Sequence, residues 1–191
     1  MIDTLLQAVV ATPLSDADSD FCLMNLEENK CLKEMPFYLS MLTMDASQIN
    51  QILRDTATFQ SLDNKLMCGY LTGFIDLICE YRGLYYVLDY KTNSLPDYQN
   101  ETLTHAMREH NYGLQYWIYT VVLHRYLQHR LPDYDYERHF GGVRYLFVRG
   151  MQPESAMSGV YQDRPDLVRV EALAALFGGG LCKTKLNRRA G

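Results

Sequence analysis

Residues 68–92 contain two strand-forming runs that are separated only by Arg82-Gly83, and this short connection constrains the fold more than any other feature. Both runs are rich in apolar, β-branched and aromatic residues, which favour β-strands. A two-residue turn joins antiparallel strands and fixes which residues face each other. We therefore predict a β-hairpin in which Asp76 lies directly opposite Asp89.

Three charged side chains occupy positions of this hairpin where a sheet normally buries apolar ones. Cross-strand neighbours have Cβ atoms about 4.5–5.5 Å apart, and like charges at that distance repel. Lys91 follows Asp89 by two residues and therefore projects from the same face. The predicted faces are Phe74, Asp76 and Ile78 with Val87, Asp89 and Lys91 on one side, and Ile75, Leu77 and Cys79 with Tyr86, Leu88 and Tyr90 on the other.

Two carboxylates held this close predict a divalent-cation site. Hard oxygen ligands suit Mg²⁺, Mn²⁺ or Ca²⁺, and the cation removes the repulsion between the carboxylates. A lysine beside them can stabilise negative charge on a phosphate or position an attacking water, which is typical of phosphodiester hydrolysis. The alternative is a surface hairpin with an ordinary Asp–Lys pair, and a one-residue bulge in the turn would place the two aspartates on opposite faces.

The rest of the chain alternates between helical and strand-like segments, which predicts an α/β protein with a central mixed sheet flanked by helices. At 191 residues the chain suits one domain with its own core. Pro36 indicates that its strand is an edge strand or carries a bulge. The expected helices cover 3–11, a segment that begins at an Asp45 N-cap, 101–130 with a break near 111–113, and 165–177, and the other expected strands cover 30–41, 139–151 and 159–161.

Composition limits the classes of protein that this chain can belong to. Five cysteines without a C-x-x-C pair argue against a zinc or iron–sulfur site and fit a reducing compartment. No apolar run approaches the roughly 18 residues of a membrane span, and the N-terminus lacks the basic segment of a signal peptide. We therefore expect a cytoplasmic protein with no membrane partner.

Charge and motifs further limit the ligands. The formal net charge of −5 argues against a strong general affinity for nucleic acid, although basic residues gather in the second half and in a tail at 178–191. The sequence contains no G-x-x-x-x-G-K-[ST] motif, so we expect no P-loop site for ATP in this segment.

Several motifs together resemble a known family. "GFID" at 73–76 is followed thirteen residues later by "DYK" at 89–91, then by "YGLQYWIYTVVLHRYLQHRLPDYDYERHFGGVRYLFVRGM" at 112–151 and "GVYQDRP" at 159–165. This pattern resembles the C-terminal nuclease domains of RecB-type subunits of exodeoxyribonuclease V, in the PD-(D/E)xK nuclease superfamily, with Ile75 where the name-giving proline would stand. The resemblance covers about 28–177, and we interpret 1–27 as a helix and polar turn that end a longer upstream segment.

The resemblance implies roles for particular residues in a restriction-endonuclease-like core. It implies a metal site, normally for Mg²⁺, with Lys91 as the catalytic lysine. The implied metal ligands are Asp76, Asp89 and the main-chain carbonyl of Tyr90. Gln115 and Tyr119 match a Q-x-x-x-Y motif and are expected to approach the DNA or the active site together, while Glu34 is expected to border the site; taken alone, these three residues are also compatible with ordinary structural positions.

The resemblance also implies that the chain acts in a multisubunit complex, and it identifies one metal ligand of the family that this chain lacks. Members of the family act with RecC-like and RecD-like subunits. The resemblance therefore implies an Mg²⁺-dependent exodeoxyribonuclease that degrades unwound, single-stranded DNA in double-strand-break repair and recombination. Their metal site includes an upstream histidine in a segment resembling H-x-x-F-E, whereas all five histidines here follow Lys91. We therefore expect weak metal binding by the isolated chain, and a catalytically silent docking module is the alternative function.

Overall fold

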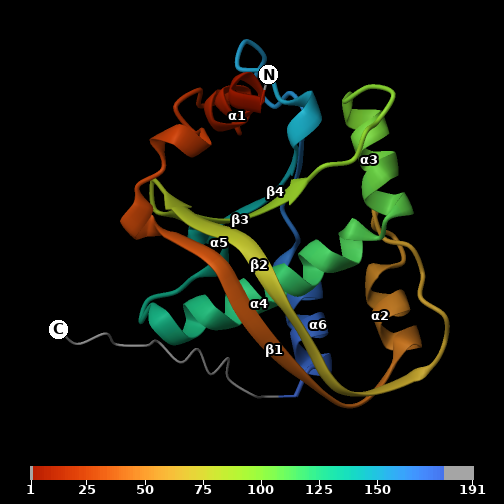
Figure 1. The fold of residues 1–191 in the computed structure, drawn as a ribbon. Helices are drawn as coiled ribbons and strands as arrows, with labels where there is room; N and C mark the ends of the chain where they lie inside the picture. Colours follow the sequence, from red (N-terminus) through yellow and green to blue (C-terminus); the bar gives the residue numbers. More distant parts are fainter. Residues whose placement is uncertain (1, 179–191) are drawn as a thin grey trace.

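The structure, a computed structural model, describes residues 2–178, and a single five-stranded sheet forms its centre (Figure 1). The strands are β1 Cys31–Asp45, β2 Leu66–Tyr81, β3 Leu84–Lys91, β4 Phe140–Phe147 and β5 Val160–Asp163. They lie in the order β1-β2-β3-β4-β5, and neighbours are antiparallel except for β3 and β4, which are parallel. This confirms the predicted mixed sheet, with Pro36 in an edge strand. The predicted basic tail lies outside the described residues beyond Gly178.

Helices connect the strands and cover the sheet. Within residues 2–178 the α-helices are α1 Ile2–Ala11, α2 Ala46–Leu53, α3 Asn100–Glu109, α4 Tyr112–Arg130, α5 Tyr136–His139 and α6 Leu167–Leu176, and the 3-10 helices are η1 Leu23–Asn25, η2 Glu28–Lys30 and η3 Val148–Gly150. The predicted cap is present, because Asp45 and Gln48 form a capping box at the start of α2. The predicted break also occurs, where Asn111 adopts a left-handed conformation with φ 51°. No helix in this described part is long and apolar enough to cross a bilayer.

Two apolar cores lie on opposite faces of the sheet. The larger core packs α4 against β3 and β4 and includes Val87, Val121 and Val143. The smaller core joins the other face to α1 and the segment after it through Val9 and Phe21. Burial on both faces explains why the runs in β3 and β4 are almost continuously apolar rather than alternating.

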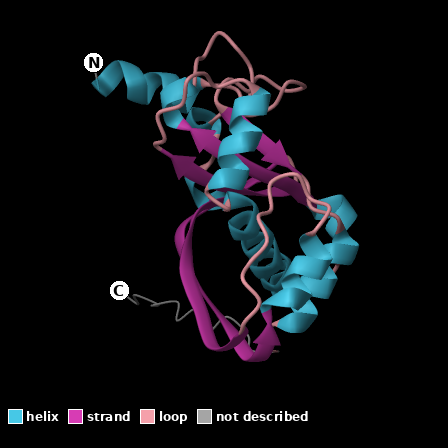
Figure 2. Cartoon of the chain, turned by 90° about the vertical axis from the view of Figure 1, so that its right-hand side faces the viewer, coloured by secondary structure: helices cyan, strands magenta, loops and turns pink. Residues whose placement is uncertain are grey.

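β1 and β2 extend beyond the other strands as a two-stranded arm, which Figure 2 shows as a pair of long curved strands. β2 pairs with β3 only from Leu77 to Tyr81, so its first part pairs with β1 alone. The inner face of the arm enters the larger core through Phe37 and Leu39. Its outer face is left open, and Phe74 there is 61% exposed.

The predicted faces of β2 are wrong before Asp76 and correct after it. Leu77 packs in the smaller core as alternation requires, but Ile75 packs in the larger core, on the same side as Ile78. Alternation therefore breaks between Ile75 and Leu77. The break lies opposite Glu34 of the neighbouring strand, whose left-handed φ of 51° marks a local irregularity in β1.

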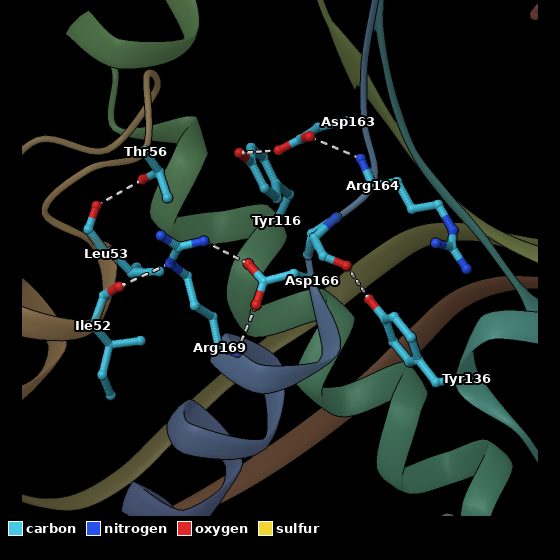
Figure 3. Close-up of polar contacts among 10 residues, drawn as sticks. Ile52, Leu53, Thr56, Tyr116, Tyr136, Asp163, Arg164, Asp166 and Arg169 are labelled. Atoms are coloured by element: carbon cyan, nitrogen blue, oxygen red, sulfur yellow. Dashed lines mark hydrogen bonds and ion pairs between the residues drawn. The ribbon is translucent and has the colours of Figure 1, made fainter.

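Polar contacts fix α6 and the end of β5 against α2 and α4 (Figure 3). Asp166 caps α6 by accepting a hydrogen bond from the backbone N–H of Arg169, whose Nε donates to the carbonyl of Ile52. The hydroxyl of Tyr116 in α4 donates to Asp163 over 2.6 Å. The last contact anchors α4, the helix that carries Gln115 and Tyr119, to the end of β5.

Candidate active site

The turn between β2 and β3 has the predicted length and register. Arg82 and Gly83 have φ values of 49° and 83°, which is the two-residue turn that suits a twisted hairpin. The hydrogen-bonded pairing ends at Leu77 opposite Leu88. Asp76 and Asp89 occupy the next positions, so the register brings them together where the two strands separate.

The side chain of Asp76 connects β2 to β3 where the two strands separate. Its Oδ2 accepts a hydrogen bond from the backbone N–H of Tyr90 over 3.1 Å, and the carboxylate is half-buried. This contact attaches β2 to β3 through a side chain at the point where the backbone ladder stops. One oxygen of Asp76 is therefore held beside Asp89 while the group stays open to solvent on one side.

Asp89 is the most deeply buried carboxylate of the site, with only 2% of its surface exposed. Its Oδ2 lies 2.5 Å from Nζ of Lys91 but accepts no well-directed hydrogen bond within the described structure. Burial raises the pKa of Asp89 to about 6, against the opposing effect of Lys91, and the charge of Asp76 adds to the rise. The fold thus holds a carboxylate whose buried charge is only partly compensated.

Lys91 is 9% exposed and its ammonium group contacts four side chains. Besides Asp89, Nζ donates a hydrogen bond to Oε1 of Gln115 over 3.0 Å. It also faces two aromatic rings, with the ring centres of Tyr112 and Tyr145 at 4.0 Å and 5.0 Å. These contacts hold a positive charge next to the two aspartates.

Gln115 and Tyr119 lie on one face of α4, as their spacing predicts. Nε2 of Gln115 donates to the hydroxyl of Tyr119 over 2.9 Å, and that hydroxyl donates to the carbonyl of Phe74 over 2.9 Å. The pair therefore links Lys91 in β3 to the backbone of β2 two residues before Asp76. Tyr119 is also buried, so its position in the core and its position beside the site are compatible.

The remaining predicted residues lie at the edge of this group. Glu34 is exposed, and the register places it next to Asp76 across β1 and β2, between the pairs Lys33–Leu77 and Met35–Ile75. Tyr90 follows Asp89 directly, and its backbone N–H is the donor to Asp76. The roles of Glu34 and of the Tyr90 carbonyl stay predictions.

Two residues of this group were not predicted. Tyr145 is completely buried in β4, where it pairs with Asp89, and its hydroxyl donates to Oε1 of Gln115 over 3.0 Å. Tyr112 lies at the start of α4, next to the break at Asn111. No sequence signal distinguishes them among fifteen tyrosines, because their approach to Lys91 depends on how α4 and β4 pack against β3.

The oxygen atoms of the site suit a hard divalent cation. Asp76 and Asp89 supply carboxylate oxygens, and Oδ2 of Asp89, which pairs with Lys91 but accepts no hydrogen bond, is a buried acceptor that a cation would satisfy. No group of three or more His, Cys, Asp or Glu side chains with metal-binding geometry occurs in residues 2–178. His124 lies in the second half of α4, where it is buried and forms a hydrogen bond with Tyr134, so we assign it a structural role. The residues therefore fit a cation held by two carboxylates.

Comparison of the sequence with known proteins identifies relatives of this chain. The sequence profile described as "PD-(D/E)XK nuclease superfamily" matches residues 6–180. The "RecBCD enzyme subunit RecB" of Escherichia coli is 40% identical over 181 residues, which cover 90% of this chain and 15% of that protein. The subunit of the same name from Haemophilus influenzae is 42% identical with the same coverage, and that of Mycobacterium tuberculosis is 45% identical over 62% of the chain and 12% of the relative. The chain thus spans about 15% of the length of the first two relatives.

Proposed function

Because this chain belongs to the PD-(D/E)XK nuclease superfamily and is a RecB-like nuclease domain, we propose that it hydrolyses DNA phosphodiester bonds with the help of a divalent cation. The observation that carries the proposal is the meeting of Asp76, Asp89 and Lys91 at the end of the β2–β3 ladder. Buried charges are costly unless they are compensated, so their retention at one point indicates a functional site.

In the proposed site Asp76, Asp89 and the main-chain carbonyl of Tyr90 hold Mg²⁺, and Mn²⁺ or Ca²⁺ can take its place. A bound cation would supply charge neutralisation at the phosphate and a more acidic water. The incomplete compensation of Asp89 supports this assignment, because a second positive charge beside Lys91 would favour the ionised carboxylate.

The protein's own groups orient the reaction in this proposal. The Lys91 ammonium stabilises negative charge that develops on the phosphate and orients the attacking water. Gln115 fixes that ammonium by accepting its hydrogen bond, and Tyr119 fixes Gln115 against β2. We further propose that Glu34, which is exposed next to Asp76 across β1 and β2, approaches the substrate.

The biological setting is proposed from the relatives. A RecB-like subunit that works with RecC-like and RecD-like subunits, as an exodeoxyribonuclease V in the cytoplasm, would deliver unwound single strands to this domain during double-strand-break repair and recombination. The acidic net charge is compatible with such delivery, because cations and Lys91 act on the phosphate locally while a larger assembly provides the general attraction to DNA.

The test is degradation of single-stranded DNA by the protein in its natural length and assembly, with and without Mg²⁺. Asp89→Ala and Lys91→Ala are expected to abolish the reaction. Asp63→Ala and Lys65→Ala are matched controls, because both residues are exposed in the loop before β2. Full activity in the Asp89 and Lys91 variants would refute the assignment of the site.

A catalytically silent docking module is the second candidate function. It is favoured by the small number of ligands, since no three His, Cys, Asp or Glu side chains of residues 2–178 are arranged to hold a metal ion together. Calorimetry of the 191-residue chain with Mn²⁺ separates the two functions. Binding that Asp76→Ala and Asp89→Ala remove supports the nuclease, whereas the absence of binding at millimolar Mn²⁺ supports the silent module.

A further inference from the structure

We propose that Tyr112 and Tyr145 are positioning residues that hold the Lys91 ammonium against the faces of their rings, so that Lys91 keeps its place when Asp89 binds another partner. The proposal rests on the proposed nuclease function, in which Asp89 serves both Lys91 and a cation. It adds two residues, from α4 and β4, that the predicted site did not contain.

Contacts other than the ion pair with Asp89 also restrain the ammonium group of Lys91. The ring centre of Tyr112 lies 4.0 Å away and that of Tyr145 lies 5.0 Å away, both within the range of cation–π attraction. Oε1 of Gln115 accepts a hydrogen bond over 3.0 Å. Three of the four contacts therefore remain if Asp89 turns to another cation.

Each ring is held by contacts that do not involve Lys91. The hydroxyl of Tyr145 donates to Gln115, and its strand pairs with β3 at Asp89. The hydroxyl of Tyr112 donates to Oδ1 of Asn93 over 3.3 Å, and its ring stacks on His110 with centres 5.2 Å apart. The two rings are thus preorganised by different elements, as a positioning device requires.

The rings also limit how much water reaches the ammonium. Lys91 is 9% exposed although its neighbour Thr92 is exposed, and the ring of Tyr112, itself half-buried, lies over its ammonium group. Cation–π attraction is stronger where the cation is desolvated. We therefore expect the cation–π attraction between Tyr112 and Lys91 to be stronger than that between a surface tyrosine and a cation in water.

The first experiment follows Lys91 directly by NMR in the 191-residue chain without metal or DNA. The ε-methylene signals of Lys91, assigned with Lys91→Ala, are expected upfield because ring currents shift protons that lie over an aromatic face. Tyr112→Leu is expected to remove most of this shift, and Tyr112→Phe to restore it, since phenylalanine keeps the ring. Tyr126→Leu is the matched control on the same helix, because Tyr126 faces Arg130 instead.

The second experiment measures DNA hydrolysis by the same variants in the protein's natural assembly. Loss of one cation–π contact predicts a kcat on the order of 2- to 30-fold lower for Tyr112→Leu, with KM for DNA nearly unchanged. Tyr112→Phe is expected to recover most of kcat, and Tyr126→Leu to match the wild type. Tyr145→Phe is expected to lower kcat by severalfold through Gln115 while it keeps the Lys91 shift.

The outcomes distinguish this inference from the proposed function. An unchanged Lys91 shift in Tyr112→Leu overturns the inference, and so does a raised KM at constant kcat, which would make Tyr112 a DNA contact. A lost shift in a chain whose assembly hydrolyses no DNA supports the positioning of Lys91 while it refutes the nuclease.

Discussion

In the metal-free chain, the free energy of unfolding of Asp89→Asn minus that of the wild type is expected to increase as pH rises. Burial raises the pKa of Asp89 from its ordinary value of 3.8 to about 6, even though Lys91 lowers it. Between these values the folded chain binds a proton that the unfolded chain has released. The free energy of unfolding of the wild type therefore falls with rising pH, at most by about 1.4 kcal/mol per unit.

The size of the effect follows from the two pKa values. The favourable contribution of Asp89 is fully present below pH 3.8 and is lost as pH rises through about 6, which amounts to roughly 3 kcal/mol in total. Asparagine does not titrate, so it removes this dependence. Any constant cost of leaving Lys91 without its carboxylate moves the whole curve and does not change its slope.

Urea unfolding in the presence of a chelator measures this difference. The chain contains a single tryptophan, Trp117, which is buried in α4 and therefore reports unfolding by fluorescence. Between about pH 4.5 and about pH 7.5, the stability of Asp89→Asn minus that of the wild type should rise by about 2 kcal/mol. Asp63→Asn, an exposed control, should show almost no change.

A difference that stays constant with pH, or that falls as pH rises, would refute the reasoning. A constant difference would mean that the ion pair with Lys91 balances the burial of Asp89, and a falling difference that it outweighs the burial, so that the site is a compensated structural pair. That result would also weaken the case for a cation, because the carboxylate would need no further positive charge.

Three further predictions concern a side chain of the site, the packing of α4 and the cap of α2. Gln115→Ala should lower kcat by about tenfold or more with little change in KM, because a hydrogen bond to a charged group is lost, whereas Gln128→Ala at the exposed end of α4 should not. Gly113→Ala should lower the melting temperature, because the added Cβ would lie 2.2 Å from the carbonyl oxygen of Thr58, and this clash, at about 1–3 kcal/mol, exceeds the helix-propensity gain of about 1 kcal/mol. Asp45→Ala should destabilise the chain by about 1 kcal/mol in urea unfolding through loss of the α2 cap, and should leave Mn²⁺ binding unchanged.

Local features of the fold were predictable because they depend on neighbouring residues. The turn at Arg82-Gly83, the Asp45 cap and the break at Asn111 follow from local conformational preferences and side-chain hydrogen bonds, and all three are present. The helix α5 was not predicted, since it is a single turn of four residues that periodicity cannot reveal.

The faces of the arm were not predictable in the same way. Strict alternation fails between Ile75 and Leu77, opposite Glu34 of the neighbouring strand, which adopts a left-handed conformation. That conformation belongs to a residue more than forty positions away along the chain. A prediction from β2 alone therefore places Phe74 on the wrong side, although it places Asp76 correctly.

The sequence by itself determined that Asp76, Asp89 and Lys91 would meet, because a two-residue turn sets the register of a hairpin and a period of two sets its faces. Only the tertiary structure decided the environment of that meeting point. Packing of α4 and β4 against β3 buries Asp89 and brings the rings of Tyr112 and Tyr145 to Lys91. Burial and electrostatic coupling depend on every element that surrounds a group, and such distant neighbours are not encoded in local spacing.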